Sequence, residues 1–383
     1  MLRVERIEDA VTFEALAAEW DPLLAASGQD HLFLTWEWLR TWWRHLGGRR
    51  RLSLLVARDG RQCVALAPLA MAPPRLDRLV PFRSLEFLGA GTVGSDYLDL
   101  IVRRGEEDAA IDAIGDHLAR RGCMLHLDRV RREGSLAARL AERLHPRGWT
   151  RRQAAADVCP FIRLGGHTWD SYLSSLGSAH RYNFQRRLKN LHRRHTVEFH
   201  RVTREEDRGP ALAGLLRLHE ARWRPRGGSD AFGSAALVSF HEDLTRRALA
   251  RGWLRLFELR LDGRAAASLY AFRHRDTFSF YQAGFDPAYA KESVGLVTMG
   301  LAIKSAIEEG AAEYDLLHGD EPYKAHWAQE SRGLASLEIY PPRLHGLACR
   351  QAVDLGRTAR RVARRLLPPA VADRLAMGLR AWA

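Results

Sequence analysis

The run Asp320-Glu-Pro-Tyr-Lys324 places four reactive side chains beside one proline, directly after a segment that we expect to be a strand. Loops beyond the carboxyl ends of strands form clefts in α/β proteins. Acyl transfer to an amine or a hydroxyl needs a base, donors for the developing oxyanion and an acid for the leaving thiolate. We predict Asp320 or Glu321 as the base, Tyr323 as the acid and Lys324 as an anchor for an anionic substrate. A solvated, charged turn is the alternative interpretation.

Residues 286–296 follow one expected strand and open an expected helix. Free backbone N–H groups and the positive end of the helix dipole bind phosphate at such a place. Glu292 would repel a phosphate, and an ordinary loop with a serine N-cap is an equally good interpretation. Tyr281, on the strand before this turn, is predicted to face the same cleft, with a core position as the alternative. The residues predicted to contact a phosphate-bearing donor are Lys291, Ser293, Val294, Gly295 and Leu296.

Two further places carry candidate residues. His219 and Trp223 stand late in an expected helix, where His219 could be a second base near neutral pH, although a packed histidine is the favoured interpretation. Asp96 and Tyr97 are predicted to line an acceptor cleft.

Residues 181–195 are rich in arginine and histidine. Arg181 and Gln185 are one helical turn apart, so we expect a basic face there. Such a face could hold an anionic acceptor, a nucleotide-linked sugar or a tRNA, and a solvated helix face is at least as good an interpretation. His192 and His195 have no third ligand nearby, so we predict no metal site.

The composition is that of a globular protein, with 46% hydrophobic and 27% charged residues. Only four of the 59 basic residues are lysines, which gives weight to Lys291 and Lys324 as positions that need a compact ammonium. The formal charge of +13 favours anionic partners. The four cysteines have no disulfide or zinc spacing. We find no spanning segment and no signal core, so we expect a cytoplasmic protein.

Two parts of the chain repeat one order of elements. Each has two helices followed by a hairpin at an Asp-Gly pair, and the two pairs are offset by 262 − 59 = 203 residues. In the first part the second helix, residues 35–46, carries four tryptophans, and we interpret it as core, with a sugar platform as the alternative. Strand, helix and strand then follow, with an expected strand at 97–102 and expected helices at 106–121 and 293–309. Such an order predicts α/β domains with mixed sheets. We place the boundary near residues 157–166.

The tail is a separate unit. Apolar residues recur at helical spacing from Leu344 to Leu366, and residues 343–365 hold seven arginines and one acid, a net +6. This basic amphipathic helix could lie on an anionic membrane or pack on the body of the protein.

With these elements in place, the chain resembles the GNAT acyltransferase fold present twice, as in the Fem-type transferases. It is most similar to the CelD/BcsL (BioF2-like) family of acetyltransferases. The resemblance covers residues 13–340 and is carried by Phe33-Leu-Thr-Trp-Glu-Trp-Leu-Arg-Thr-Trp-Trp43, Ser178-Ala-His-Arg-Tyr-Asn-Phe-Gln-Arg-Arg-Leu188, Tyr281-Gln-Ala-Gly-Phe-Asp-Pro287 and Leu317-His-Gly-Asp-Glu-Pro-Tyr-Lys-Ala-His-Trp327.

The resemblance implies tandem GNAT-like domains at 1–160 and 161–342, followed by a basic helical tail at 343–383. It implies transfer of an acyl group, expected to be acetyl, from acyl-CoA to an amine or hydroxyl of a small-molecule, saccharide or peptide acceptor in envelope or exopolysaccharide metabolism. No metal and no specific nucleic acid are expected. A Fem-like transferase that uses charged tRNA and a non-catalytic GNAT-like scaffold are the alternatives.

Overall fold

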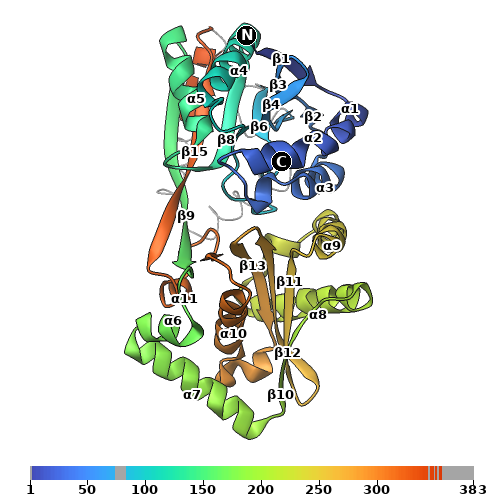
Figure 1. Cartoon of the computed structure of the whole chain (residues 1–383), viewed down its shortest axis with the longest axis vertical. Helices are drawn as coiled ribbons and strands as arrows, with labels where there is room; N and C mark the ends of the chain where they lie inside the picture. The colour runs from blue at the N-terminus through green and yellow to red at the C-terminus, as the bar shows by residue number, and fades with distance from the viewer. Residues whose placement is uncertain (1, 74–82, 344–345, 349, 352, 356–383) are drawn as a thin grey trace.

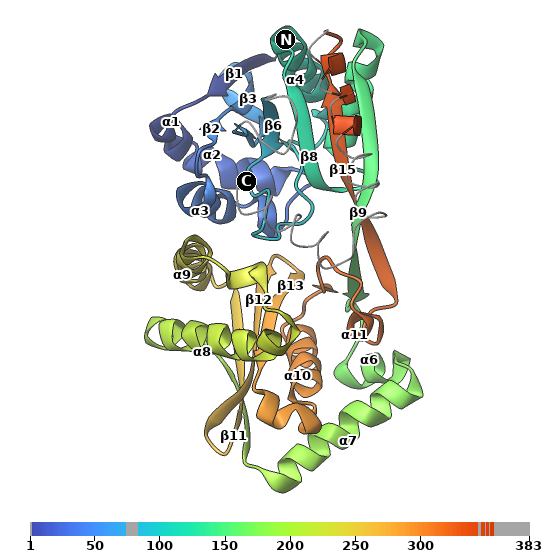
Figure 2. The same cartoon turned by 180° about the vertical axis from the view of Figure 1, so that it is seen from behind.

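The computed structural model describes residues 2–73 and 83–343, together with 346–348, 350–351 and 353–355. The N-terminal half, residues 2–149, lies above the C-terminal half, residues 164–329, in Figure 1. Two long strands, β9 (Thr150–Arg163) and β15 (Glu330–Tyr340), run between the halves, and the view from behind shows the same arrangement (Figure 2).

The C-terminal half is built on the strands β10 to β14 in chain order. Neighbouring strands are antiparallel up to β13, whereas β13 and β14 are parallel. The helix α10 (Val294–Glu308) connects this parallel pair, which gives a βαβ unit. The strands are β10 (Val197–Arg201), β11 (Leu254–Leu261), β12 (Arg264–His274), β13 (Thr277–Phe285) and β14 (Glu313–Asp315).

The N-terminal half repeats this order in two pieces. A four-stranded sheet has the order β1-β3-β4-β7, and β2, β5, β6 and β8 extend the sheet of the other half. The strands β6 and β8 are parallel and α4 (Glu107–Arg121) connects them, as α10 connects β13 and β14. The predicted hairpins at the two Asp-Gly pairs are confirmed. The strands are β1 (Arg3–Ile7), β2 (Arg51–Leu52), β3 (Leu54–Asp59), β4 (Gln62–Ala67), β5 (Leu69–Met71), β6 (Ser84–Phe87), β7 (Ile101–Val102) and β8 (Met124–Arg131).

The two long strands join both halves into one eleven-stranded sheet. β9 pairs with β15 along most of its length and with β14 through residues 161–163. β15 pairs with β8 of the N-terminal half as well. Because β9 passes through the predicted boundary at 157–166, the sheet is continuous there, and the domain limits stay a prediction.

Helices cover both faces of the C-terminal sheet. Alternate residues of β12 point to opposite faces. Leu269 and Ala271 pack with α10, whereas Tyr270 and Phe272 belong to the core that α8 and α9 share. The helices of this half are α6 (Trp169–Ser175), α7 (Ser178–Arg194), α8 (Glu205–Trp223), α9 (Ala235–Ala250), α10 and α11 (Pro322–Ala325).

The tryptophan-rich helix α3 (Trp36–Leu46) packs against α9 of the other half. Thr35 caps its first turn, and the ring of Trp38 is fully buried against Phe240 and Tyr281. The interpretation of this helix as core is therefore confirmed. The other N-terminal helices are α1 (Ala10–Ala15), α2 (Ala17–Ala26), α4 and α5 (Leu136–Leu144).

One expected strand, residues 97–102, is largely wrong. Only Ile101 and Val102 are extended, because Tyr97 has a φ of 59° and cannot continue a strand. The carboxylate of Asp99 instead accepts hydrogen bonds from the amides of Leu136 and Ala137, where α5 begins.

Among the residues that the structure describes, no helix is long and apolar enough to cross a membrane. Most of the predicted tail helix lies outside the described residues. In its described part, Asp354 pairs with Arg152 and Val353 packs with Met124 and Tyr340, so this stretch lies against the N-terminal half.

Candidate functional site

A cavity of about 210 Å³ lies where the pairing of β13 with β14 has ended. Its walls are mainly apolar and come from β12, β13, the first turns of α10, and α11. Two predicted donor contacts, Gly295 and Leu296, and the predicted acid, Tyr323, line it together. The structure therefore brings residues of the predicted donor turn and of the Asp320–Lys324 run to one place. The other main lining side chains are His180, Arg222, Phe280, Phe285, Met299, His326 and Trp327.

The N-terminus of α10 is open. Ser293 occupies the N-cap position in a left-handed conformation, with φ of 58°, and its hydroxyl makes no capping bond. Within the described chain, the amides of Val294, Gly295 and Leu296 have no acceptor. Three N–H groups at the positive end of a 15-residue helix form a site for an anion beside the cavity.

The charge of Glu292, which would repel a phosphate, is compensated. Its carboxylate is 3.0 Å from Nε2 of His195, whose Nδ1 lies 2.6 Å from Asp262. These two carboxylates, Asp262 foremost, raise the pKa of His195 and favour the imidazolium. Arg187 donates to the carbonyl of Lys291, so two cationic residues lie beside the same turn.

Tyr323 stands at the start of α11 and is only partly exposed. Burial, with a smaller contribution from the charge of Glu321, raises its pKa well above the ordinary value. The phenol therefore stays protonated at neutral pH, as an acid must.

His180 and His326 were not predicted as site residues, although both stand in the segments that carried the resemblance. Their rings stack with centroids 5.1 Å apart, and His180 also meets Trp327 edge-on. The Nε2 atom of His180 is buried and has no hydrogen-bond partner in the described residues. Burial, together with His326, lowers the pKa of His180, so a neutral imidazole lines the cavity.

Lys324 lies beside the cavity but its ammonium is occupied. Nζ donates to the carbonyls of Leu317, His318 and Gly319 at 3.2, 2.6 and 3.5 Å, and lies 2.9 Å from Glu321. Three N–H bonds meet four acceptors, and the residue is 3% exposed. Lys324 therefore holds the loop before α11 in shape, and its role as a substrate anchor stays a prediction.

The predicted bases, Asp320 and Glu321, are both exposed in this loop. Neither is among the residues that line the cavity. Their catalytic role also stays a prediction.

His219 and Trp223 line a second, larger cavity of about 800 Å³ at the end of α8. Nδ1 of His219 donates to the carbonyl of Ala283 (3.1 Å), and Nε2 accepts from the hydroxyl of Ser229 (3.0 Å). Burial lowers the pKa of His219. Because Ala283 lines the first cavity, the two cavities lie near the same part of β13.

Tyr281 is not among the residues that line the first cavity. It occupies a bulge of β13, its ring packs in the aromatic core, and its hydroxyl donates to the carbonyl of Val93 in the N-terminal half. The structure therefore agrees with the core interpretation of Tyr281. Arg181 donates to the carbonyl of Ser174, and Gln185 is exposed on α7, outside the cavity.

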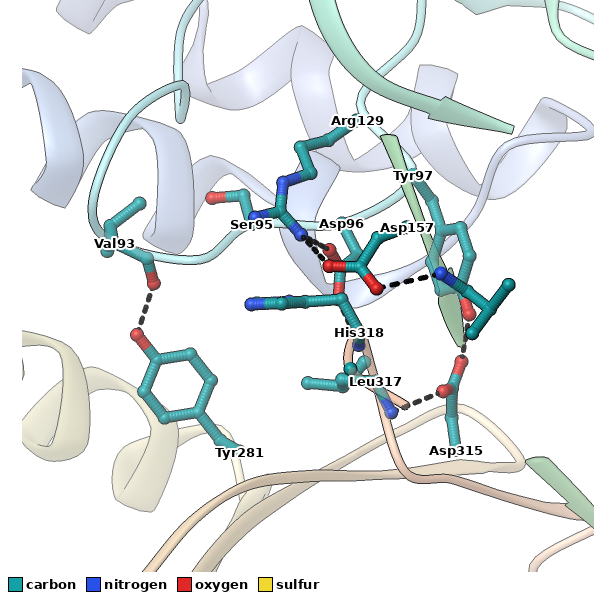
Figure 3. A network of polar contacts seen from close by, with 12 residues as sticks. Val93, Ser95, Asp96, Tyr97, Arg129, Asp157, Tyr281, Asp315, Leu317 and His318 are labelled. Atoms are coloured by element: carbon teal, nitrogen blue, oxygen red, sulfur yellow. Dashed lines mark hydrogen bonds and ion pairs between the residues drawn. The ribbon is translucent and has the colours of Figure 1, made fainter. Parts of the chain in front are cut away.

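Asp96 and Tyr97 lie at the junction of the halves, in the polar network of Figure 3. Asp96 is fully buried, and its Oδ2 atom accepts from the amide and from Nδ1 of His318, both at 2.9 Å. The hydroxyl of Tyr97 donates to Asp315 (2.7 Å), and burial raises the pKa of Asp315 to about 6. The network connects the N-terminal half to the loop before α11.

Comparison with known proteins adds the fold family. Residues 178–325 match the family described as acetyltransferase (GNAT) domain. The structure of FemX aligns over 86% of this chain and 96% of its own, with a TM-score of 0.59 and 12% identity. The chain has a tandem GNAT-type fold.

Two lysylphosphatidylglycerol synthetase structures share this tandem GNAT-type fold. L-PGS from Bacillus licheniformis aligns over 89% of this chain and 95% of its own, with a TM-score of 0.52 and 14% identity. The C-terminal domain of the putative synthetase from Agrobacterium fabrum aligns over 89% and 96%, with a TM-score of 0.50 and 11% identity. None of the curated proteins matches the sequence.

The open end of the β13–β14 pair, the N-terminus of α10 and the helix α11 thus lie together in the C-terminal half, where the donor contacts were predicted. In the described chain, no group of three or more His, Cys, Asp or Glu side chains has the geometry to hold a metal ion.

Proposed function

We propose that the C-terminal half transfers an acyl group from an acyl-CoA thioester to an amine or a hydroxyl. The observation that carries this proposal is the meeting of three features at one cavity. These are the open N-terminus of α10, the mainly apolar walls between β13 and α10, and the protonated Tyr323.

The residues present fit such a donor. The amides of Val294, Gly295 and Leu296 suit its pyrophosphate, and Arg187 and Lys291 stand beside that turn. The cavity is apolar except for a few side chains, which suits a long, thin arm that carries isolated polar groups. The unpartnered Nε2 of His180 would bond one of those groups, since a buried polar atom gains most from a partner.

A bound thioester supplies an activated carbonyl carbon and a thiolate leaving group. Tyr323 donates its hydroxyl proton to that thiolate, because a tyrosine hydroxyl is protonated at neutral pH. The apolar walls exclude water around the carbonyl.

The finer assignments belong to the same proposal. Acetyl is the proposed acyl group, in line with the family that residues 178–325 match. A small-molecule, saccharide or peptide acceptor of envelope or exopolysaccharide metabolism follows only from the resemblance to the CelD/BcsL (BioF2-like) family. Peripheral contact with the inner face of a membrane would involve residues 343–366, most of which lie outside the described residues.

A second candidate, transfer from an aminoacyl-tRNA, has one observation in its favour. Arg186, Lys189 and Arg193 are exposed at spacings of three and four residues along α7, so they share one basic face. Such a face suits a polyanion, and the affinity for that polyanion should fall steeply as the salt concentration rises.

The test is calorimetric titration with acetyl-CoA, followed by acetyl transfer to hydroxylamine measured as release of CoA. Tyr323→Phe should keep the donor affinity within about threefold and lower the transfer rate by a factor of about 10²–10⁴. Tyr182→Phe is the matched control, because Tyr182 is 66% exposed on α7, and it should change neither quantity.

Absence of acetyl-CoA binding by the unaltered chain would overturn the acyl-CoA proposal. If it bound charged tRNA instead, and Arg186→Ala weakened that binding, the second candidate would replace the first. Binding of acetyl-CoA without any transfer would point to the non-catalytic scaffold.

A further inference from the structure

His318 and Asp96 form a pair across the junction of the two halves (Figure 3). Asp96 is fully buried, and its Oδ2 atom is 2.9 Å from Nδ1 of His318. A carboxylate oxygen can only accept, so Nδ1 of His318 carries the hydrogen. In the neutral ring the lone pair is then on Nε2, and the side chain is 32% exposed. A buried carboxylate that orients a histidine in this way prepares Nε2 to accept a proton.

The backbone around this pair is strained. Tyr97 follows Asp96 with φ of 59°, Leu317 precedes His318 with φ of 54°, and Arg129, which lies 3.4 Å from Oδ1 of Asp96, has φ of 61°. Bulky residues with positive φ are rare and cluster at functional sites. Asp96 and His318 are thus each next to a residue with positive φ, and Arg129, beside Asp96, has a positive φ itself.

His318 is connected to the donor site through the loop before α11, and it is not itself among the residues that line the cavity. His318 and Tyr323 stand in one loop and helix, and Lys324 fixes them to each other through the carbonyl of His318 (2.6 Å). On the facing strand, Tyr281 bonds the carbonyl of Val93, and it stands between Phe280 and Ala283, which both line the cavity. Segment 93–96 of the N-terminal half therefore meets both β13 and the loop that leads from β14 to α11.

The imidazole has room because of one glycine. A Cβ atom on Gly94 would lie 3.1 Å from Cε1 of His318, and Gly94 has φ of 72°. The N-terminal half thus supplies a close backbone surface for the ring as well as the carboxylate that orients it.

We propose that His318 is the general base of the transfer and that Asp96 is its positioning residue; this inference rests on the proposed function. Nε2 of His318 takes the proton from the acceptor N–H or O–H as that atom bonds to the acyl carbon. The C–S bond breaks, and the thiolate takes the proton of Tyr323. The proton on His318 returns to Tyr323 through solvent, so both groups are reset. The acceptor therefore approaches from the junction of the halves, which gives the N-terminal half a part in catalysis.

The chain offers a matched control. His274 of the C-terminal half also pairs with an aspartate of the N-terminal half, since its Nε2 lies 2.7 Å from Oδ1 of Asp30. Its imidazole is only 7% exposed, against 32% for His318, and stands at the end of β12. His274→Asn therefore removes an equivalent contact between the halves without touching the proposed base.

The experiment compares three nucleophiles with acetyl-CoA as donor, namely water, ethanolamine and hydroxylamine, in the full chain and in His318→Asn, Asp96→Asn, His274→Asn and His219→Asn. Asparagine at 318 keeps a donor for Asp96 but has no base at the Nε2 position. It should keep donor affinity and melting temperature and lower transfer to water and ethanolamine by a factor of about 10²–10⁴. Transfer to hydroxylamine, which is unprotonated at neutral pH and needs little base catalysis, should fall by less than about tenfold. Asp96→Asn should follow the same pattern more weakly, and His274→Asn should leave all three rates unchanged.

Equal losses for all three nucleophiles, or the same losses in His274→Asn, would mean that His318 only holds the halves together. A loss confined to His219→Asn would move the base to the second cavity. Hydroxylamine transfer without any His318-dependent transfer to water or ethanolamine would also overturn the inference and leave the acyl-CoA proposal standing. A chain that does not bind acetyl-CoA would overturn both.

Discussion

The carboxyl group of Asp315 is buried between the halves. It accepts from Tyr97 and from the amide of Leu317, and burial still raises its pKa to about 6 from an ordinary value near 3.8. A raised acid pKa means that the folded protein holds the proton more tightly than the unfolded chain does. The stabilising contribution is therefore complete below pH 4 and is lost as the pH rises through 6.

Asp315→Asn should remove this dependence. The free energy of unfolding of the natural chain, relative to this variant, should fall by about 2–3 kcal/mol between pH 4 and pH 7.5. Urea denaturation at several pH values measures the difference. Asp108→Asn, at a carboxylate that is 96% exposed, should show no such trend. A pH-independent difference for Asp315→Asn would contradict the assignment.

The sequence predicted some of the residues around the donor cavity and missed others. Tyr323, Gly295 and Leu296 could be found because a reactive side chain after a strand and a glycine at a helix start have local signals. His180 and His318 had no such signal. One becomes notable only through an unpartnered buried nitrogen, and the other only through an aspartate 222 residues away in the chain.

At the scale of elements, α8 and β13 approach each other as closely as backbones allow. A Cβ atom on Gly284 would lie 2.3 Å from the amide nitrogen of His219 and 2.6 Å from the carbonyl carbon of Leu218. Neither atom belongs to a flexible side chain, so the helix itself would have to move. Gly284 also lines the donor cavity, which couples helix packing to donor binding.

Gly284→Ala should therefore destabilise the protein by roughly 1–3 kcal/mol and weaken acetyl-CoA binding. Gly214→Ala is the matched control in α8, because its added Cβ would meet only the carboxylate end of Glu258, at 3.4 Å. That change should stabilise the protein by about 0.5–1 kcal/mol. Thermal unfolding and calorimetry give both quantities, and equal effects of the two substitutions would refute the packing argument.

Elements were easier to predict than their pairing. Apolar periodicity and Asp-Gly turns located the hairpins and the helices α3, α4 and α10. The expected strand at 97–102 was largely wrong because alternating apolar residues there fill the core around a left-handed turn at Tyr97, which periodicity cannot show.

At the scale of the whole molecule, sequence reasoning missed one feature. This feature, the crossing, is the pair of strands β9 and β15 that run between the halves and pair with each other. The repeat predicted two similar halves, and the fold confirms the repeated order. The pairing of β9 with β15 has no local signal in the sequence, because partners such as Thr150 and Tyr340 are separated by the whole C-terminal half. The halves are therefore similar in order without being separable units.

A truncation should show that the fold of the N-terminal half depends on β15. The fragment 1–329 lacks β15, so β8 and most of β9 have no strand between them. We expect no cooperative thermal transition and rapid aggregation, because two long edges stay unpaired. Truncation after Leu355, which keeps every described contact, should melt like the full chain. A cooperative transition in the 1–329 fragment would show that the fold does not depend on β15.

The same crossing governs the order of events during synthesis. A ribosome releases the chain from its N-terminus, yet the strand that completes the first half is encoded within the last fifth of the sequence. The nascent N-terminal half must therefore wait, with the edges of β8 and β9 that pair with β15 open, until residues 330–340 have left the exit tunnel. Holding chaperones that bind exposed strand edges would find their substrate in this interval, and slow translation of the C-terminal half would lengthen it.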